Sequence, residues 1–412
     1  MDIDDTPEEA AFRAEARAWL AANAPAKGST DDFSDAFFDQ RADMATTLRL
    51  NAEWQRRLWD EGWAGISYPR EWYGRGGTLT QELIFAEESA AFGVISGAFA
   101  VAHSMVGPAI LELGTDEQRH RFIPAMLRGD EMWCQLFSEP GAGSDLAGLA
   151  TRAVRDGDQW IVNGQKVWTS NADTSQYGIL LARTDPDAPK HRGITYFLVD
   201  MATPGIEVRP LRQMTGDAHF SEVFLTDVAI PASAVLGGPG EVGNGWRAAV
   251  HTLANERAMI GGSQSMTDIG PVVELARRVG AVDDPVVRQQ LAEAHIRMRI
   301  IAFLGYRART AISQGLPPGP ETSVVKLAFS DHFRHLASLT KAVQGASGML
   351  DGGESSVLSW RFLFSPSTAI AGGTSEVQRS IIGERVLGLP REQQSSEPRV
   401  GATNRERVAA NR

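Results

Sequence analysis

The stretch that decides the fold is Leu136-Phe137-Ser138-Glu139-Pro140-Gly141-Ala142-Gly143-Ser144-Asp145. A strand entering it from the preceding apolar residues cannot continue past Pro140, because proline cannot donate to a strand ladder. Gly141 and Gly143 allow another body to approach the backbone closely. Successive free N–H groups in such a loop form an anion-binding concavity. The stretch is therefore a candidate for gripping a phosphate-bearing cofactor or substrate; an ordinary polar turn between two domains is the alternative.

The composition is that of a globular protein with an acidic balance. The 412 residues suffice for two or three packed units, and 43 % of them are hydrophobic. The formal net charge of −11 argues against a nucleic-acid partner, which needs a basic face. No apolar run approaches the roughly 20 residues of a membrane span, so no membrane partner is expected. Cys134 is the only cysteine and the histidines lack a metal-ligand spacing, which predicts a reducing, cytoplasmic setting and no metal site.

The periodicity of the chain changes twice and predicts an α+β protein in three parts. An N-terminal α-helical domain is expected over residues 1–132, where apolar residues recur at helical spacing. A middle β-barrel or β-sandwich domain is expected over 133–240, where short apolar runs alternate with turn residues. A C-terminal four-helix-bundle domain is expected over 241–390, followed by a polar, disordered tail over 391–412.

The expected elements follow from the same patterns. The helices are expected at 6–24, 42–61, 78–92, 94–113, 115–127, 245–279, 284–314 and 321–350, with a last one that starts after 372–376 and ends by 388. The strands are expected at 153–155, 159–164, 178–182, 193–199, 206–209 and 221–225.

Three motifs in this layout resemble the flavin-dependent acyl-CoA dehydrogenase family. They are SEPGAGSD at 138–145, NGQKVWTS at 163–170 and AGGTSEVQR at 371–379. Their order and spacing inside a helix–β–helix chain are similar to the family over nearly the whole length. The finer texture resembles actinobacterial members that degrade fatty acids by β-oxidation or sterol side chains.

The resemblance implies an FAD held between the β domain and the C-terminal helices. Gln135, Phe137 and Ser138 are then expected to face the flavin ring, Trp168 to stack beside it, and Thr169 and Ser170 to bond its polar edge. Gly143 and Ser144 are expected to hold the pyrophosphate, and Ser144 also to approach the acyl-CoA. The alternative for Trp168 is an aromatic residue of a strand that packs in the core.

The ADP half of the FAD is implied to lie across a subunit boundary. Gln344 and Gly348 match the segment that reaches the FAD of a neighbouring subunit, and Thr374 and Glu376 match positions at a helix start, which suits a pyrophosphate. Family members often have an arginine and a phenylalanine near 276–280; that phenylalanine is missing here, which leaves Arg277 or Arg278 as a substitute.

The reaction implied by the resemblance needs a carboxylate with a raised pKa to remove the α-proton of a thioester. Most members carry it where this chain has Gly372, whose backbone N–H, with Gly373 beside it, can still polarise the thioester carbonyl. Glu256 matches the alternative site used by branched-chain and long-chain members, and it shares a helical face with Ala249 and Leu253. Arg257 is then expected to contact the CoA. The alternative for Glu256 is a structural glutamate that pairs with an arginine of another helix or is exposed at the margin of the apolar stripe.

The resemblance and these residues together predict an acyl-CoA dehydrogenase that forms a 2-enoyl-CoA with Glu256 as base. The resemblance implies an electron-transfer flavoprotein as electron acceptor and a homo-oligomer, a dimer or tetramer, with a hetero-oligomer also open. Two alternatives stay open: an auxiliary flavin-holding subunit, and an oxidase or a dehydrogenase of carrier-protein thioesters.

Overall fold

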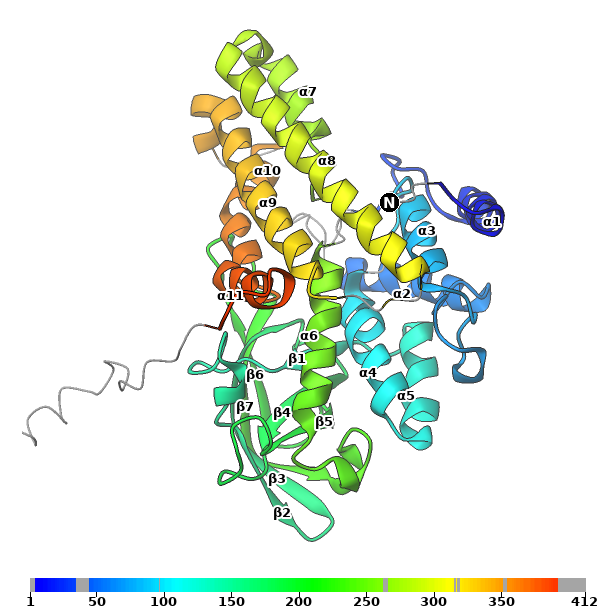
Figure 1. Cartoon of the computed structure of the whole chain (residues 1–412), viewed down its shortest axis with the longest axis vertical. Helices are drawn as coiled ribbons and strands as arrows, with labels where there is room; N and C mark the ends of the chain where they lie inside the picture. The colour runs from blue at the N-terminus through cyan, green and yellow to red at the C-terminus, as the bar shows by residue number, and fades with distance from the viewer. Residues whose placement is uncertain are drawn as a thin grey trace, which may run out of the picture.

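The computed structural model describes residues 4–34, 44–95, 97–261, 266–314, 316, 319–350 and 354–391. Helices of the first third, a β sheet and a second group of helices form three neighbouring parts (Figure 1). The predicted mixed α+β architecture in the order helix, sheet, helix is confirmed. The predicted disordered tail lies outside the described residues, apart from Arg391.

The N-terminal part is helical, as its apolar spacing predicts. Its α-helices are α1 (Pro7–Asn23), α2 (Met44–Asp60), α3 (Leu79–Ser89), α4 (Gly107–Leu113) and α5 (Asp116–Arg128). Thr6, Thr78 and Thr115 each cap a helix in a capping box, in which two backbone donors at the helix start are satisfied reciprocally.

The helix expected over 94–113 is broken. The structure has a 3-10 turn at Gly97–Phe99 and a π-helical turn at Ala102–Val106 before α4 begins. Pro108 lies in the first turn of α4 and lacks the N–H that an α-helix entering from 102–106 would need. The π turn accommodates that missing donor, and the helical pattern of the sequence does not reveal it.

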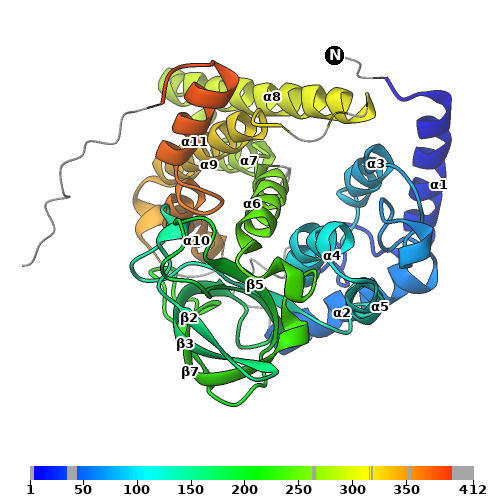
Figure 2. The same cartoon turned by 60° about the horizontal axis from the view of Figure 1, so that its bottom comes forward.

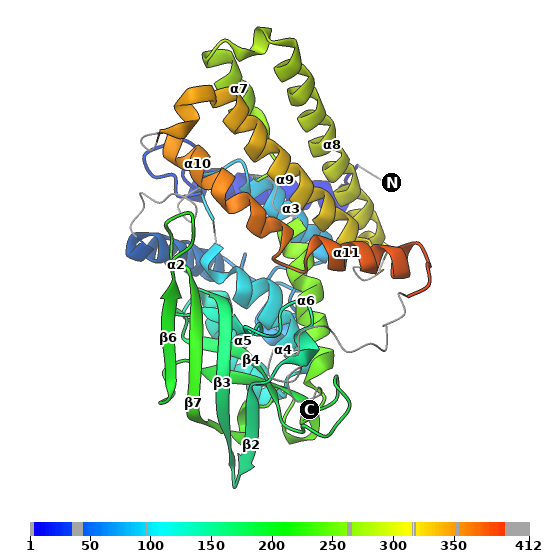
Figure 3. The same cartoon turned by 90° about the vertical axis from the view of Figure 1, so that its left-hand side faces the viewer.

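The middle part is one seven-stranded sheet. Its strands are β1 (Trp133–Leu136), β2 (Arg152–Asp156), β3 (Gln159–Ser170), β4 (Tyr177–Arg183), β5 (Ile194–Asp200), β6 (Ile206–Leu211) and β7 (Phe220–Pro231). The order is β1-β4-β2-β3-β7-β6, and β5 pairs with β4. The long antiparallel strands β3 and β7 lie side by side, with β6 beside β7 (Figure 3).

The C-terminal part is helical. Its α-helices are α6 (Gly245–Gly261), α7 (Gly270–Arg278), α8 (Pro285–Ser313), α9 (Thr322–Gln344), α10 (Glu354–Phe364) and α11 (Ser375–Ile381). A single helix was expected over 245–279, but the structure has two. A new helix, α7, begins at Gly270, and Pro271 lies in its first turn. The helix α10 was not expected.

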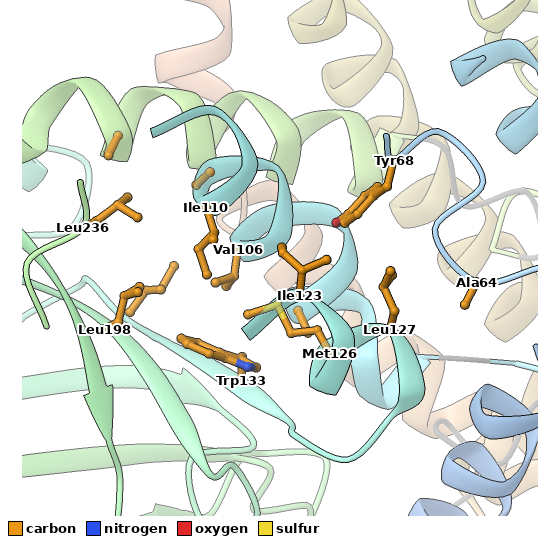
Figure 4. Close-up of a cluster of buried hydrophobic side chains, with 14 of the residues drawn as sticks. Ala64, Tyr68, Val106, Ile110, Ile123, Met126, Leu127, Trp133, Leu198 and Leu236 are labelled. Carbon is orange, nitrogen blue, oxygen red and sulfur yellow. The ribbon is translucent and has the colours of Figure 1, made fainter. Parts of the chain in front are cut away.

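A buried core joins the first two parts to α6. Figure 4 shows Ile110 of α4 and Met126 of α5 facing Trp133 of β1 and Leu198 of β5. Burying such side chains stabilises the fold by roughly 1.5–3 kcal/mol each. The core therefore holds β1, which leads directly into the loop at 136–145, in a defined place.

The helix α6 runs through the centre of the molecule, from the sheet to α9 (Figures 1 and 2). A Cβ atom at Gly245 would lie 2.4 Å from the backbone nitrogen of Tyr196, so glycine is what lets α6 begin so close to β5. Two turns later the Thr252 hydroxyl lies 3.2 Å from the Tyr196 hydroxyl. These contacts set the position of α6, and with it the position of Glu256.

Candidate functional site

The loop at 136–145 leaves β1 and presents an open backbone. Glu139 and Ala142 exchange two backbone hydrogen bonds of 3.0 Å, which close the loop into a tight turn. A Cβ atom added at Gly141 or Gly143 would meet nothing within 4 Å, so both glycines border open space. Gly143 and Ser144 are exposed. The loop therefore leaves room for a ligand directly against its main chain.

Phe137 differs from its neighbours in this loop. Its side chain is 2 % exposed, and its ring meets the edge of the Tyr196 ring with centroids 5.9 Å apart. The Phe137 ring therefore belongs to the core, and only its main chain remains for the expected flavin contact. Gln135 and Ser138 are partly exposed.

A buried ion pair joins the first two motifs. Lys166 is completely buried, and its Nζ donates to the Glu139 carboxylate at 2.8 Å and to the Phe137 carbonyl at 3.1 Å. Glu139 also accepts hydrogen bonds from the backbone N–H groups of Ala150 and Thr151. Burial alone would raise the pKa of Glu139, but Lys166 and these donors hold it below its usual value.

Sequence reasoning missed the role of this pair. Glu139 and Lys166 both stand inside motifs quoted for the resemblance, and a lysine amid a strand was the available signal. Burial lowers the pKa of Lys166 to about 8, against the opposing charge of Glu139. The pair ties the loop at 136–145 to β3, because a buried charge is stable only with its partner in place.

Trp168 is turned out of the sheet. The register of β3 against β7 shifts between Lys166 and Thr169, and Trp168 adopts a φ of 60° within that irregularity. Its indole is 61 % exposed, so the alternative of a core aromatic is wrong. Such irregularities redirect side chains near functional sites. Thr169 is buried, and its Oγ1 has no hydrogen-bond partner among the described residues; Ser170 is partly exposed.

Glu256 lies beside the start of the loop at 136–145. Its Oε2 is 3.5 Å from Nε2 of Gln135, which places the carboxylate next to β1. The side chain is partly buried on α6, on the same face as the buried Ala249. Burial raises the pKa of Glu256, opposed by Gln135, Arg257, the backbone N–H of Gly372 and Lys326. No described arginine of another helix pairs with it within 4 Å, which argues against the structural alternative.

The third motif forms a glycine turn before α11. Gly372 and Gly373 have φ values of 65° and 92°, a conformation that favours glycine. The Gln378 side chain donates to the Gly372 carbonyl at 2.7 Å, and Lys326 Nζ donates to the Gly373 carbonyl at 2.7 Å. The backbone N–H of Gly372 faces the Glu256 carboxylate and opposes the rise in its pKa.

At the start of α11, Thr374 is partly exposed, whereas Ser375 is buried. Thr374 caps the helix by accepting from the Val377 backbone N–H at 3.2 Å. Glu376 is exposed in the first turn.

Gln344 and Gly348 lie at the other end of α9. Eighteen residues of helix separate Lys326 from Gln344, a rise of about 27 Å. The helix α7, with Arg277 and Arg278 at its end, packs at that far end. Within one chain Gln344 and Gly348 therefore lie far from the glycine turn that Lys326 holds.

Arg257 follows the candidate base. Burial lowers the pKa of its guanidinium, and Glu256 opposes this shift. Arg385, in the π-helical turn after α11, repels it from the other side. Of these two arginines, Arg257 is the one that acts on the candidate base.

The chain belongs to the acyl-CoA dehydrogenase family, whose models cover all three parts of the fold. Models of the family's N-terminal, middle and C-terminal domains match residues 6–130, 134–228 and 243–387. The chain is therefore an oxidoreductase. In the described part of the chain, no helix combines the length and the apolar character that crossing a bilayer requires.

Relatives and solved structures show what the chain is similar to. Acyl-CoA dehydrogenase IpdE1 of Mycobacterium tuberculosis is 38 % identical over 92 % of this chain and 98 % of its own length. Acyl-CoA dehydrogenase FadE34 of the same organism is 43 % identical over 82 % of this chain and 46 % of its own length. The structure of the Tcur3481-Tcur3483 steroid ACAD is 27 % identical, with a TM-score of 0.79 over 95 % of this chain and 100 % of that one.

FAD is the cofactor of this family, and the residues present fit it. The open space at Gly141 and Gly143 admits a phosphate-bearing chain against the backbone. The exposed indole of Trp168 offers a flat apolar face, and the orphaned hydroxyl of Thr169 a polar contact for a ring edge. The buried amide oxygen of Gln344 also lacks a partner among the described residues, at the far end of α9.

Proposed function

We propose that the chain removes one hydrogen from each of the α- and β-carbons of an acyl-CoA thioester, giving the 2-enoyl-CoA. Glu256 is the base. Its carboxylate takes the α-proton and becomes the neutral acid, while the developing enolate oxygen is stabilised by backbone N–H groups at Gly372 and Gly373. When bound, FAD supplies the acceptor for the β-hydride. The observation that carries this proposal is the Glu256 carboxylate, desolvated and 3.5 Å from Gln135.

The other residues hold the reactants. Gln135, Ser138, Trp168, Thr169 and Ser170 are proposed to position the flavin. Gly143, Ser144, Thr374 and Glu376 are proposed to bind the phosphate-bearing half, with Gln344 and Gly348 acting on a neighbouring subunit. Ser144, Arg257 and Gly373 are proposed to contact the acyl-CoA. Reoxidation by an electron-transfer flavoprotein completes the cycle.

We further propose a bulky substrate, such as a steroid-derived acyl-CoA. Gly372 has no side chain where most family members carry their base, so the volume beside the thioester is larger. The name of a similar solved structure, a steroid ACAD, points the same way.

Anaerobic flavin bleaching tests the function. The FAD-loaded protein is mixed with short, branched, long and steroid-derived acyl-CoAs, and the flavin absorbance is followed. At least one bulky acyl-CoA is expected to bleach the wild-type flavin, and Glu256→Gln is expected to abolish bleaching with FAD still bound. Glu274→Gln, which changes a carboxylate exposed on α7, is the matched control. Full bleaching by Glu256→Gln would refute the assignment of the base.

An auxiliary subunit is the second candidate. Similar solved structures include a complex of two different chains, ChsE4-ChsE5 of Mycobacterium tuberculosis. A homo-oligomer is favoured by the exposed apolar side chains of Val286, Ile296 and Ile300 on α8, which a second copy can cover. Sedimentation of the pure chain tests whether it forms a homo-oligomer. The bleaching assay tests the auxiliary role, since the flavin of an auxiliary subunit would bleach only after another chain is added. Rapid peroxide formation in air would favour an oxidase, and preference for a carrier-bound acyl group would favour the carrier route.

A further inference from the structure

The side chain of Lys326 is the most deeply buried charge near the candidate base outside the motifs. It lies in the second turn of α9 and is completely buried. Burial of an ammonium group is costly unless nearby groups compensate for lost water. Among the described residues, no carboxylate lies within 4 Å of its Nζ, unlike the Lys166 ammonium. A lysine kept in such a place therefore calls for an explanation.

The hydrogen bond of Lys326 identifies its target. Its Nζ donates to the Gly373 carbonyl at 2.7 Å, in the glycine turn that precedes α11. Gln378 donates to the Gly372 carbonyl and, at 3.3 Å, to the Gly373 carbonyl as well. The turn is therefore held from α9 and α11 together, and its left-handed glycines would otherwise allow many conformations.

The charge of Lys326 reaches Glu256 through a poorly solvated space. The ammonium favours the ionised form of Glu256, together with Arg257. The carboxylates that face Lys326 in turn are Glu256, Asp331 of its own helix and Glu376 of α11. Because α9 packs against both α6 and α11, Lys326 joins the helix of the base to the turn facing it.

We propose that Lys326 is a positioning residue for the base: its buried ammonium group clamps the Gly372–Gly373 turn beside Glu256 and places a fixed positive charge on the α9 side of that carboxylate. It touches neither substrate nor cofactor in this role. It acts through Gly373 and Glu256, and the inference rests on the proposed function of Glu256 as base.

The ionisation of Glu256 is the direct readout. The infrared carbonyl band of its protonated carboxyl group is titrated in the FAD-loaded protein, and the band is assigned by its loss in Glu256→Gln. In Lys326→Met and Lys326→Gln the midpoint is expected to rise by about one pH unit, because a nearby positive charge that favours the carboxylate is gone. Lys326→Arg keeps the charge and is expected to keep the midpoint. Lys27→Met removes a lysine bond to the Ala90 carbonyl elsewhere and serves as control.

The positioning role has a second readout. The flavin reduction rate at its high-pH plateau is expected to fall about tenfold in Lys326→Met, and less in Lys326→Gln, whose amide still donates to Gly373. An unchanged midpoint in both variants would overturn the proposal, as would equal plateau rates for wild type and Lys326→Met. If Lys326→Met fails to fold, the Gln and Arg variants decide the midpoint. If no acyl-CoA bleaches the wild-type flavin but the midpoint still moves, the proposed function fails while the placement of Lys326 beside Glu256 stands.

Discussion

Glu139 lies within the loop at 136–145 and Glu256 lies beside its start, and their pKa values move in opposite directions. Glu139 accepts from Lys166 and two backbone N–H groups, so its pKa is lowered in spite of burial. Burial prevails at Glu256 and raises its pKa, because the long contact with Gln135, the Gly372 N–H and the charges of Arg257 and Lys326 offset it only in part. Residue type and position in a motif do not distinguish them. The number and quality of donors decides whether a buried carboxylate is a structural anion or a base.

Breaking the ion pair is expected to have the largest effect. Lys166→Met leaves Glu139 buried without its cation and should lower the free energy of unfolding by about 3–5 kcal/mol. Urea denaturation of the apoprotein measures this loss. The double variant Glu139→Gln/Lys166→Met, which removes both charges, should be more stable than Lys166→Met. A single variant as stable as wild type would show that the pair contributes nothing.

The two glutamates should also differ in how stability depends on pH. Glu139 has a lowered folded pKa, so its contribution is present above the unfolded pKa and is lost as pH falls through the folded value. Glu256 has a raised folded pKa, so its ionisation destabilises the fold as pH rises through the window above the usual glutamate value. At neutral pH, Glu139→Gln should therefore cost about 1–3 kcal/mol, and Glu256→Gln should be neutral or stabilising.

Thermal unfolding between pH 4 and 8 measures both effects in the apoprotein. The difference between Glu256→Gln and wild type should vanish at the acid end, because both then carry a neutral group. A loss of stability in Glu256→Gln at pH 7 would mean that Glu256 is itself a structural anion.

Gly372→Ala tests the turn beside the base. Its φ of 65° costs an L-residue about 1–2 kcal/mol, so the free energy of unfolding should fall by about that amount. Gly280→Ala, at a φ of 74° in open space on the far side of the bundle, is the matched control. Both variants should lose similar stability, and only Gly372→Ala should slow flavin reduction. If Gly372→Ala and Gly280→Ala reduced the flavin at equal rates, the turn at Gly372 would have no role in the reaction.

The smallest expected effect concerns the contact between β1 and the base. Gln135→Leu removes the Nε2 donor that favours the ionised form of Glu256. The low-pH limb of the flavin reduction rate should therefore move upward by about half a pH unit, since the contact is long. Stopped-flow reduction across pH measures the shift, with Gln165→Leu, which removes a hydrogen bond from β3 to Glu222 of β7, as control. A downward shift would contradict the proposed role of Gln135.

Much of the architecture could be predicted because it depends on local patterns. Threonine caps, turn residues and the two periodicities marked most helices and strands, since each acts within a few residues. The π turn at Ala102–Val106 was not predicted, because the apolar spacing over 94–113 stays helical across Pro108. The helix α10 was not predicted either.

The site shows the same division. Glu256 was predicted from its place on an apolar stripe and a motif match, whereas Lys326 and the pairing of Glu139 with Lys166 were not. Lys326 and Gly373 are 47 residues apart in the chain, so no local pattern relates them.

By itself the sequence determined the order helix, sheet, helix, the motifs of the family, and the residue types available for chemistry, because these depend on composition and near neighbours. Only the tertiary structure decided which carboxylate is paired and which is desolvated, which way Trp168 points, and that Gln344 and Gly348 lie at the opposite end of α9 from the Gly372–Gly373 turn. A pKa depends on which groups distant segments bring within a few ångströms, and only packing decides that.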